Sequence, residues 1–218
     1  NDMKIILHTL CAVLMLMAIT SCDEHREFPD TAMKTCDILC TDGKVVRFED
    51  VERQGKKPIA VVFHINQSDQ LSGTAYAVYL WDVPYTAFSD TTGVKQNTSA
   101  SMTAFDGNAN TYAMYASGIS PAAKAVFDLW CYGQSAYLPS VAEIRLLYAA
   151  KDAVNEYIRR CGGDFIPDTP DECWYWTSTE VEGMEADKAW LFSLASGALQ
   201  ETPKEQSHKI RPVITLYN

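Results

Sequence analysis

The order of strand-like and helical segments is the feature that most limits the folds open to this chain. β-branched and aromatic residues, which favour strands, are enriched in two groups of segments. These segments are residues 44–48, 59–65, 74–81, 174–179, 189–194 and 210–217. The region between the two groups carries helix signals. Strands on both sides of a helical middle predict the α+β class, with an antiparallel sheet and two or more helices packed at one side.

Two helices are expected in this middle region, because each begins with a capping signal. Ser120-Pro121 provides an N-cap serine followed by proline at the first helical position. Ser140 and Glu143 have the spacing of a capping box, and apolar residues follow at helical intervals. Gly162 is the expected C-terminal cap of the second helix. The two helices are expected over residues 122–130 and 141–161.

The strands at 59–65 and 74–81 are separated by a polar turn and predict a hairpin that ends at 82–84. A polar connection rich in Ser, Thr and Asp follows over 84–107. Connections of this length inside a domain are usually functional or mobile. Asn110 is the expected cap of a further short helix.

The N-terminal residues are expected to act as an export and anchoring signal. Met3-Lys4 precedes an apolar stretch with the length of a signal peptide, too short for a comfortable membrane span. The stretch ends in the sequence AITSC at 18–22, which resembles a bacterial lipobox, so Cys22 is the expected lipidation site. The expected organisation is a lipoprotein signal peptide over 1–21, a tether over 22–35 and a single domain over 36–218.

Two alternatives for the anchor stay open. The first is a plain secretory signal with cleavage nearby instead of lipidation. The second concerns Asp23 and Glu24, which fit retention at the inner membrane in one group of bacteria and export to the surface in another. We expect an exported protein that is anchored by its lipid to the outer membrane. Whether it faces the periplasm or the outside of the cell stays open.

The acidic balance of the chain excludes one class of partner. There are 28 Asp and Glu residues against 18 Lys and Arg, which gives a formal net charge of −10. Such a chain would repel a phosphate backbone, so nucleic acid is not an expected partner. The hydrophobic fraction of 47% is typical of a globular protein rather than a disordered one.

Five of the seven cysteines belong to the expected domain, once Cys11 is removed with the signal and Cys22 is acylated. An oxidising location permits disulfides, and an odd number leaves at least one thiol unpaired. Cys161 and Cys173 bracket a loop with Gly and Pro, so a disulfide between them is plausible, although the sequence fixes no connectivity. Cys36 and Cys40 also suggest zinc, but no nearby ligand pair completes a site. The five are Cys36, Cys40, Cys131, Cys161 and Cys173.

One segment resembles the start of a calcium loop. Asp106 to Thr111 has the oxygen-bearing residues, but the sixth position lacks glycine and Ser117 stands where a glutamate is needed. A turn with Asx caps is preferred, so no cofactor is expected and calcium is the alternative.

Residues for catalysis are sparse. The four histidines, at 8, 25, 64 and 208, are isolated from one another, and the common hydrolase, nucleotide-binding and zinc-protease motifs do not occur. Glu143 and Glu180 are candidate carboxylates, but the first has a capping role and nothing requires the two to act as an acid–base pair. The sequence predicts a protein that is not an enzyme.

Five sequence pieces in the second half of the chain occur in a characteristic order. They are FDGNANT at 105–111, YLPSVAEI at 137–144, YWTSTE at 175–180, AW at 189–190 and RPV at 211–213. Together they are similar to the C-terminal domain of Lcl-type collagen-like adhesins, which is widespread in bacterial surface proteins. The departures from that pattern are mild: Tyr137 replaces a tryptophan, Ile144 a leucine, Thr177 a serine and Ile210 a valine.

The resemblance implies a C-type-lectin-like fold, shared with formylglycine-generating enzymes and with the variable proteins of diversity-generating retroelements. It transfers no catalytic residue. The matching residues are expected to be scaffold, and Arg211 is expected to pair with Glu180 or Glu143. The scaffold set is Leu138, Pro139, Ser140, Glu143, Trp176, Glu180, Trp190 and Arg211.

The expected function is ligand binding or adhesion by a lipid-anchored protein of the cell envelope. Five tryptophans and eleven tyrosines offer contact area for a glycan or protein ligand. Loops 84–104 and 181–208 are the expected contact regions. One alternative is a structural or assembly subunit of a surface appendage or envelope complex. A less favoured alternative is an enzyme of the formylglycine-generating type, which would need a reactive cysteine pair.

Overall fold

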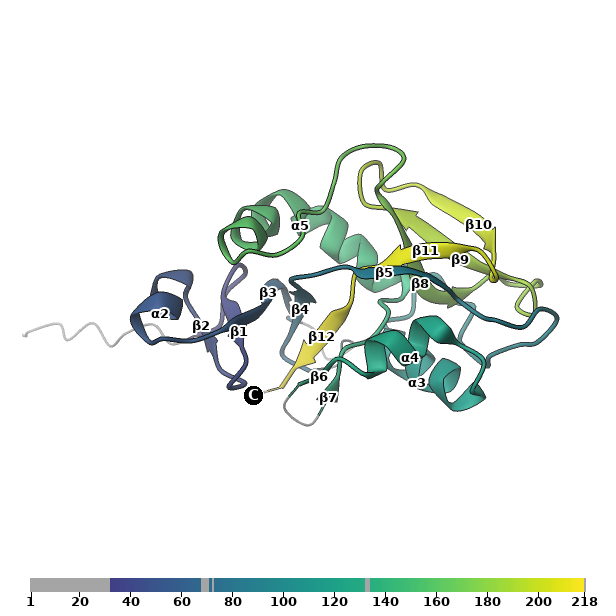
Figure 1. Cartoon of the computed structure of the whole chain (residues 1–218), viewed down its shortest axis with the longest axis horizontal. Coiled ribbons are helices and arrows are strands. Elements are labelled where there is room, and N and C mark those ends of the chain that lie inside the picture. Colours follow the sequence, from purple (N-terminus) through teal and green to yellow (C-terminus); the bar gives the residue numbers. More distant parts are fainter. Residues whose placement is uncertain (1–31, 68–70, 72, 132–133, 218) are drawn as a thin grey trace, which may run out of the picture. The chain divides into compact units, whose positions relative to one another are not determined.

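Two five-stranded sheets and the helices between and beside them build the fold (Figure 1). The structure is a computed structural model and describes residues 32–67, 71, 73–131 and 134–217. Within these residues the chain from Met33 onward forms one compact unit. The expected signal peptide over 1–21, the lipidation site Cys22 and the tether up to residue 31 lie outside the described residues.

The first sheet is antiparallel throughout and has the strand order β12-β4-β3-β1-β2. Its β3–β4 pair is the hairpin predicted from the sequence, with Val61 opposite Val78. The strands are β1 (Ile38–Cys40), β2 (Val45–Val46), β3 (Pro58–Ile65), β4 (Ala75–Tyr79) and β12 (Val213–Leu216).

The second sheet has the order β10-β9-β8-β11-β5, and its β8–β11 pair is parallel while the other pairs are antiparallel. The strands are β5 (Val83–Ala87), β8 (Trp174–Glu180), β9 (Lys188–Ser193), β10 (Leu199–Pro203) and β11 (Ser207–Ile210). A short hairpin is formed by β6 (Trp130–Cys131) and β7 (Gln134–Ser135).

Four helices lie in the described residues: α2 (Phe48–Arg53), α3 (Gly107–Ser117), α4 (Pro121–Phe127) and α5 (Val141–Arg160). Both predicted N-caps are confirmed, because Ser120 accepts a hydrogen bond from the Ala123 amide and Ser140 forms the full capping box with Glu143. The end of α5 is also confirmed. Gly162 has φ +75°, and its amide donates to the carbonyl of Arg159, a left-handed helix end that favours glycine.

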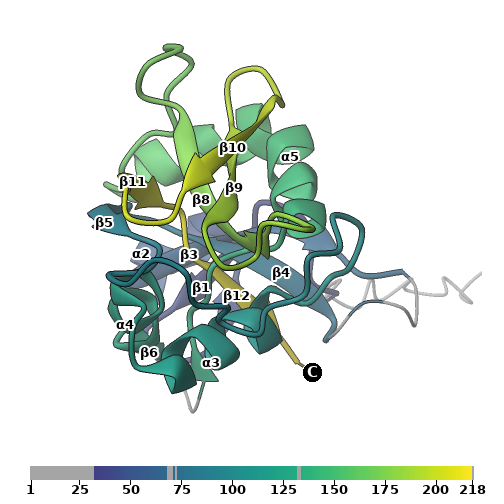
Figure 2. The same cartoon turned by 90° about the vertical axis from the view of Figure 1, so that its right-hand side faces the viewer.

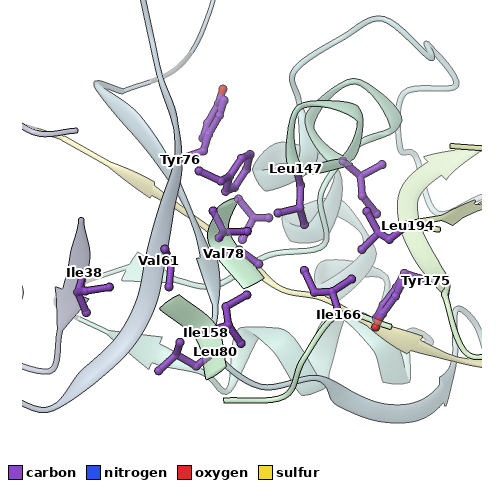
Figure 3. Close-up of a cluster of buried hydrophobic side chains, with 14 of the residues drawn as sticks. Ile38, Val61, Tyr76, Val78, Leu80, Leu147, Ile158, Ile166, Tyr175 and Leu194 are labelled. Atoms are coloured by element: carbon purple, nitrogen blue, oxygen red, sulfur yellow. The ribbon is translucent and has the colours of Figure 1, made fainter. Parts of the chain in front are cut away.

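The long helix α5 lies against both sheets and organises the main core (Figure 3). Leu147 and Ile158 of α5 belong to one buried cluster with Val78 of the first sheet and Tyr175 of the second. Helices α3 and α4 cover the opposite face of the second sheet, where Trp176 packs with the apolar side chains of α4 (Figure 2). The second sheet is therefore covered by helices on both faces.

The α+β class predicted from the sequence is confirmed, and the strands divide between two sheets. Three expected element boundaries were wrong. Phe48 begins α2 instead of ending a strand, the first central helix ends at Phe127 instead of 130, and Val83-Pro84 starts β5 instead of closing the hairpin. The expected strand over 210–217 is interrupted at Arg211-Pro212, because proline has no N–H for the ladder.

The plausible disulfide between Cys161 and Cys173 is not formed, since both thiols are free. Cys173 is buried, and its sulfur lies 3.1 Å from the Ser193 hydroxyl on β9. Cys161 follows the last residue of α5, where it packs against the main core. The thiols of Cys36 and Cys40 are free as well.

Among the described residues no helix is both long and apolar enough to cross a membrane.

Candidate ligand-binding groove

An open groove of about 470 Å³ lies at the start of α3, where three distant parts of the chain meet. Its volume falls within the range usual for small-molecule sites. Residues from the start of α3, from the first turn of α5 and from β12 contribute to it. The lining residues are Phe105, Asp106, Asn108, Ala109, Tyr112, Glu143 and Thr215.

Glu143 contributes a nearly buried carboxyl group to the groove, with 2% of its surface exposed. The Ser140 amide donates a 2.8 Å hydrogen bond to its Oε2, which completes the capping box of α5. Gly107 lies against the same oxygen, and a Cβ at this position would come within 2.2 Å of it. Glycine is therefore required here because α3 begins in direct contact with α5. Burial raises the pKa of Glu143 to about 7.

Asp106 places a second carboxyl group beside the first. It is the N-cap residue of α3, although its side chain makes no capping hydrogen bond. Its Oδ1 accepts a 2.8 Å hydrogen bond from Asn110 Nδ2. Burial raises its pKa, and the negative charge of Asp106 contributes to the raised pKa of Glu143. The two carboxyl groups are therefore electrostatically coupled.

The rim of the groove is aromatic and uncharged. Tyr112 has 65% of its surface exposed, a large value for an aromatic residue on a regular helix. The helix α3 that carries Tyr112 contains no charged residue over its 11 positions. Below the rim, Thr215 Oγ1 shares a 2.9 Å hydrogen bond with the Tyr137 hydroxyl. The flat exposed ring of Tyr112 thus lies beside hydrogen-bonding groups.

The segment that resembled a calcium loop forms the first turns of α3. Asn110, the expected cap, lies inside this helix, because the helix begins three residues earlier at Gly107. Its side chain donates to Asp106 and accepts a 2.8 Å hydrogen bond from the Ser99 amide, so it holds two parts of the 88–106 segment, which precedes α3, against the helix. In the described part of the chain no group of three or more His, Cys, Asp or Glu side chains is placed to hold a metal ion.

The structure brings some of the expected scaffold residues together and separates others. Ser140, Glu143 and Leu138 meet at Gly107, beside the groove. Trp176 is buried and donates from Nε1 to the Thr86 carbonyl at 3.0 Å, whereas Trp190 is only half-buried. Glu180 and Arg211 belong to two separate ion pairs.

The expected partner of Arg211 was wrong. Its guanidinium, which is fully buried, donates to Asp82 Oδ1 at 2.8 Å and to the Asp164 carbonyl at 2.6 Å. Glu180 instead pairs with the buried ammonium of Lys204, and Glu143 is occupied by the capping box. Asp82 follows β4 and is 129 residues from Arg211 in sequence, so no local pattern could indicate it.

The groove itself was not expected from the sequence, which favoured loops 84–104 and 181–208. Much of those regions is regular structure, since they contain β5, β9 and β10. The residues missed by sequence reasoning are Phe105, Asn108, Tyr112 and Thr215. One signal could have found Tyr112: a helix with exposed tyrosines and no charges is unusual on an acidic protein surface.

Replacing Glu143 with glutamine is expected to remove a pH dependence of stability. The folded pKa of about 7 lies above the ordinary 4.5, so this group's stabilising contribution is present below pH 4.5 and is lost as pH rises through 7. The loss amounts to about 3 kcal/mol. Glutamine keeps the capping hydrogen bond without ionising. Urea denaturation should therefore show Glu143→Gln more stable than the wild type at pH 8 and similar to it near pH 4.5.

The matched control is Glu156→Gln, because Glu156 is also on α5 and its side chain is 66% exposed. This variant should follow the wild type at both pH values. An equal pH dependence in the wild type and in Glu143→Gln would contradict the raised pKa.

Comparison with known proteins finds a solved structure of similar fold. A fimbrial protein from Bacteroides ovatus ATCC 8483 matches 83% of this chain with a TM-score of 0.60 and 13% sequence identity. The match spans 48% of that protein, so this chain corresponds to about half of it. At this identity the likeness concerns the fold, which therefore resembles that of a surface-appendage protein. No protein-family model matches the sequence. No curated protein matches it either.

Proposed function

We propose that this chain is a cell-surface binding module, and that its ligand enters the groove at the start of α3. The observation that carries the proposal is the exposed ring of Tyr112 beside the polar side chains of Asp106 and Asn108. An exposed aromatic ring next to hydrogen-bonding groups offers a stacking surface and fixes orientation, as ligand sites require. The fold likeness to a fimbrial protein supports a place at the cell surface.

Binding is a better account of the groove than catalysis. The Glu143 carboxyl is held by backbone donors, an arrangement that serves the helix cap. The thiols of Cys36, Cys40 and Cys161 have pKa values raised by burial, to about 11 for Cys161. Thiols of raised pKa are weak nucleophiles at neutral pH, which disfavours an enzyme of the formylglycine-generating type. Titration of the folded protein with a thiol reagent tests that alternative, since two fast and mutually close thiols would support it.

Replacing Tyr112 with alanine is expected to reduce ligand binding about tenfold or more, because buried aromatic contacts dominate binding energies. The purified protein would be applied to an array of glycans and host proteins, and each hit would be measured again with the variant. Tyr85→Ala is the matched control, because Tyr85 has a similar exposure of 63% and lies on β5 within the loop region favoured by the sequence.

The two variants separate two locations for the site. Loss with Tyr112→Ala and retention with Tyr85→Ala place the ligand in the groove. The reverse pattern would move the site to the 84–104 region, and equal binding by both variants would contradict the groove.

A structural subunit of a surface appendage is the second candidate, favoured by the fimbrial protein of similar fold. Such a subunit binds other subunits rather than an external ligand. Chemical crosslinking in intact cells, followed by purification of this chain, should then recover a stable assembly. Recovery of the uncrosslinked chain alone would contradict this candidate.

The proposal includes a lipid anchor at Cys22, supported by the lipobox-like sequence that precedes it. Cells grown with a labelled fatty acid should incorporate the label into the protein, and Cys22→Ser should abolish incorporation. Cys36→Ser is the control, because this cysteine belongs to the folded unit.

We also propose that the fold is C-type-lectin-like, which the five ordered sequence pieces support.

A further inference from the structure

The groove contains carboxyl groups that no cation neutralises. Glu143 and Glu180 are the two acidic residues that are buried in the described part of the chain. Glu180 is paired with the ammonium of Lys204. Glu143, by contrast, forms no ion pair with any described residue, and neither does the neighbouring Asp106. A buried carboxylate without a counter-charge is costly, and elsewhere the protein avoids this cost by pairing.

The lining of the groove determines which ligands it can accept. Lysine, arginine and histidine are absent from its described lining, so an anionic ligand would meet two carboxyl groups and no counter-charge. An ammonium group would instead donate charge-assisted hydrogen bonds to these carboxylates, and such bonds are about twice as strong as neutral ones. The groove therefore favours a cation.

The rim determines the shape of that ligand. Phe105 and Tyr112 contribute two aromatic rings, and aromatic faces attract cations and cover apolar ring surfaces. Asn108, which is exposed at the start of α3, offers both a donor and an acceptor for hydroxyl groups. A rigid ring that carries an ammonium group and hydroxyl groups uses every part of this lining.

We propose that the groove binds an amino sugar through its ammonium group, which sits between the carboxyl groups of Asp106 and Glu143 while Tyr112 covers the face of the sugar ring. This inference rests on the proposed function and names the ligand class of the same groove. The two carboxyl groups then bind the ammonium group of the ligand, and Glu143 also keeps its role in the N-terminal cap of α5.

Isothermal titration of the purified protein at pH 7 with glucosamine, N-acetylglucosamine and glucose tests the inference. The three sugars share the ring and differ in the substituent at one carbon, which carries a charge only in glucosamine. We expect glucosamine to bind about tenfold or more tightly than the other two. Asp106→Asn should remove this preference, because the amide keeps the size of the side chain and loses its charge. Asp128→Asn, at the exposed C-cap of α4, is the matched control and should keep the preference.

The outcomes distinguish the inference from the proposed function. Equal binding of all three sugars, lost in Tyr112→Ala, would overturn the ammonium inference and leave the groove as the binding site. Binding of a lysine amide in place of any sugar would overturn the amino-sugar class. Array hits that depend on Tyr112, without binding of glucosamine, would likewise overturn the inference alone. Absence of both array hits and titration signals from folded protein would overturn the two together.

Discussion

Replacing Lys204 with methionine is expected to lower the free energy of unfolding by about 3–5 kcal/mol. Lys204 is fully buried, and its ammonium is paired with the carboxylate of Glu180, which is 1% exposed. The same ammonium donates to the carbonyls of Val94 at 3.3 Å and Glu185 at 2.6 Å. Methionine has a similar length but no charge, so the variant leaves a buried carboxylate without its cation and two carbonyls without a donor.

The loss in the free energy of unfolding should be smaller when Glu180, the partner of Lys204, is also neutralised. Glu180→Gln combined with Lys204→Met removes both charges, so the double variant is expected to be more stable than Lys204→Met alone. Lys188→Met is the control, because Lys188 pairs with Glu201 at the surface, where ion pairs contribute about 0–1 kcal/mol. Urea denaturation measures all three variants. A loss below about 1 kcal/mol in Lys204→Met would contradict the role of this ion pair.

The Glu180–Lys204 ion pair matters because it holds a long segment without regular structure in place. Glu180, at the end of β8, accepts hydrogen bonds from the Gln96 amide at 2.9 Å and from the Thr98 hydroxyl at 2.9 Å. Both donors lie in the 88–106 segment, which leads directly into the groove. The Glu180–Lys204 pair therefore anchors the approach to α3, and the Lys204 variant should also weaken ligand binding.

Replacing Arg211 with alanine is expected to lower the free energy of unfolding by a similar amount, about 3–5 kcal/mol. The buried guanidinium joins Asp82, after β4, to the Asp164 carbonyl, beyond α5. Its loss leaves the Asp82 carboxylate with Lys209 at 3.4 Å and the Tyr175 hydroxyl at 3.3 Å. Arg211→Lys should be intermediate, because lysine keeps the charge but not the planar fork that reaches two acceptors.

Ligand binding provides the second readout for Arg211. Its contacts are remote from the groove lining, so the folded variant should bind as the wild type does at temperatures below its Tm. Arg53→Ala is the control for stability, because Arg53 is exposed and pairs with Asp50 one turn earlier on α2. An unchanged Tm in Arg211→Ala would contradict the structural role of Arg211. Weaker ligand binding at a temperature where the variant is fully folded would connect Arg211 to the groove.

The elements that follow local rules were predictable from the sequence. Ser120-Pro121 and the Ser140–Glu143 capping box set the starts of α4 and α5, because each satisfies backbone donors within one turn. The β3–β4 hairpin was predicted for a similar reason, since its two strands are neighbours in sequence.

The failures arise where distant segments decide the outcome. Pro84 suggested the end of a strand, yet it is tolerated in β5 because this strand lies at the edge of the second sheet and one of its sides needs no ladder hydrogen bond. The Arg211–Asp82 pair joins segments with no common pattern. The groove depends on Asp106, Glu143 and Thr215, which meet only after both sheets and α5 have packed. Sequence patterns indicate contacts between residues that are close in sequence. They carry little information on contacts between distant segments.

The position of β11 and β12 has a consequence for the order in which this protein folds. β11 lies inside the second sheet, between β8 and β5, and β12 completes the first sheet beside β4. The second sheet therefore cannot join β5 to β8 until the chain beyond residue 206 has been synthesised, and the first sheet lacks its edge strand β12 until then. Pairings of such long sequence separation form slowly, because the loop must close before any contact compensates for its entropy. We expect a growing chain whose second sheet stays incomplete during most of translation and forms late, so that truncation before residue 207 should leave the β8 and β5 edges unpaired.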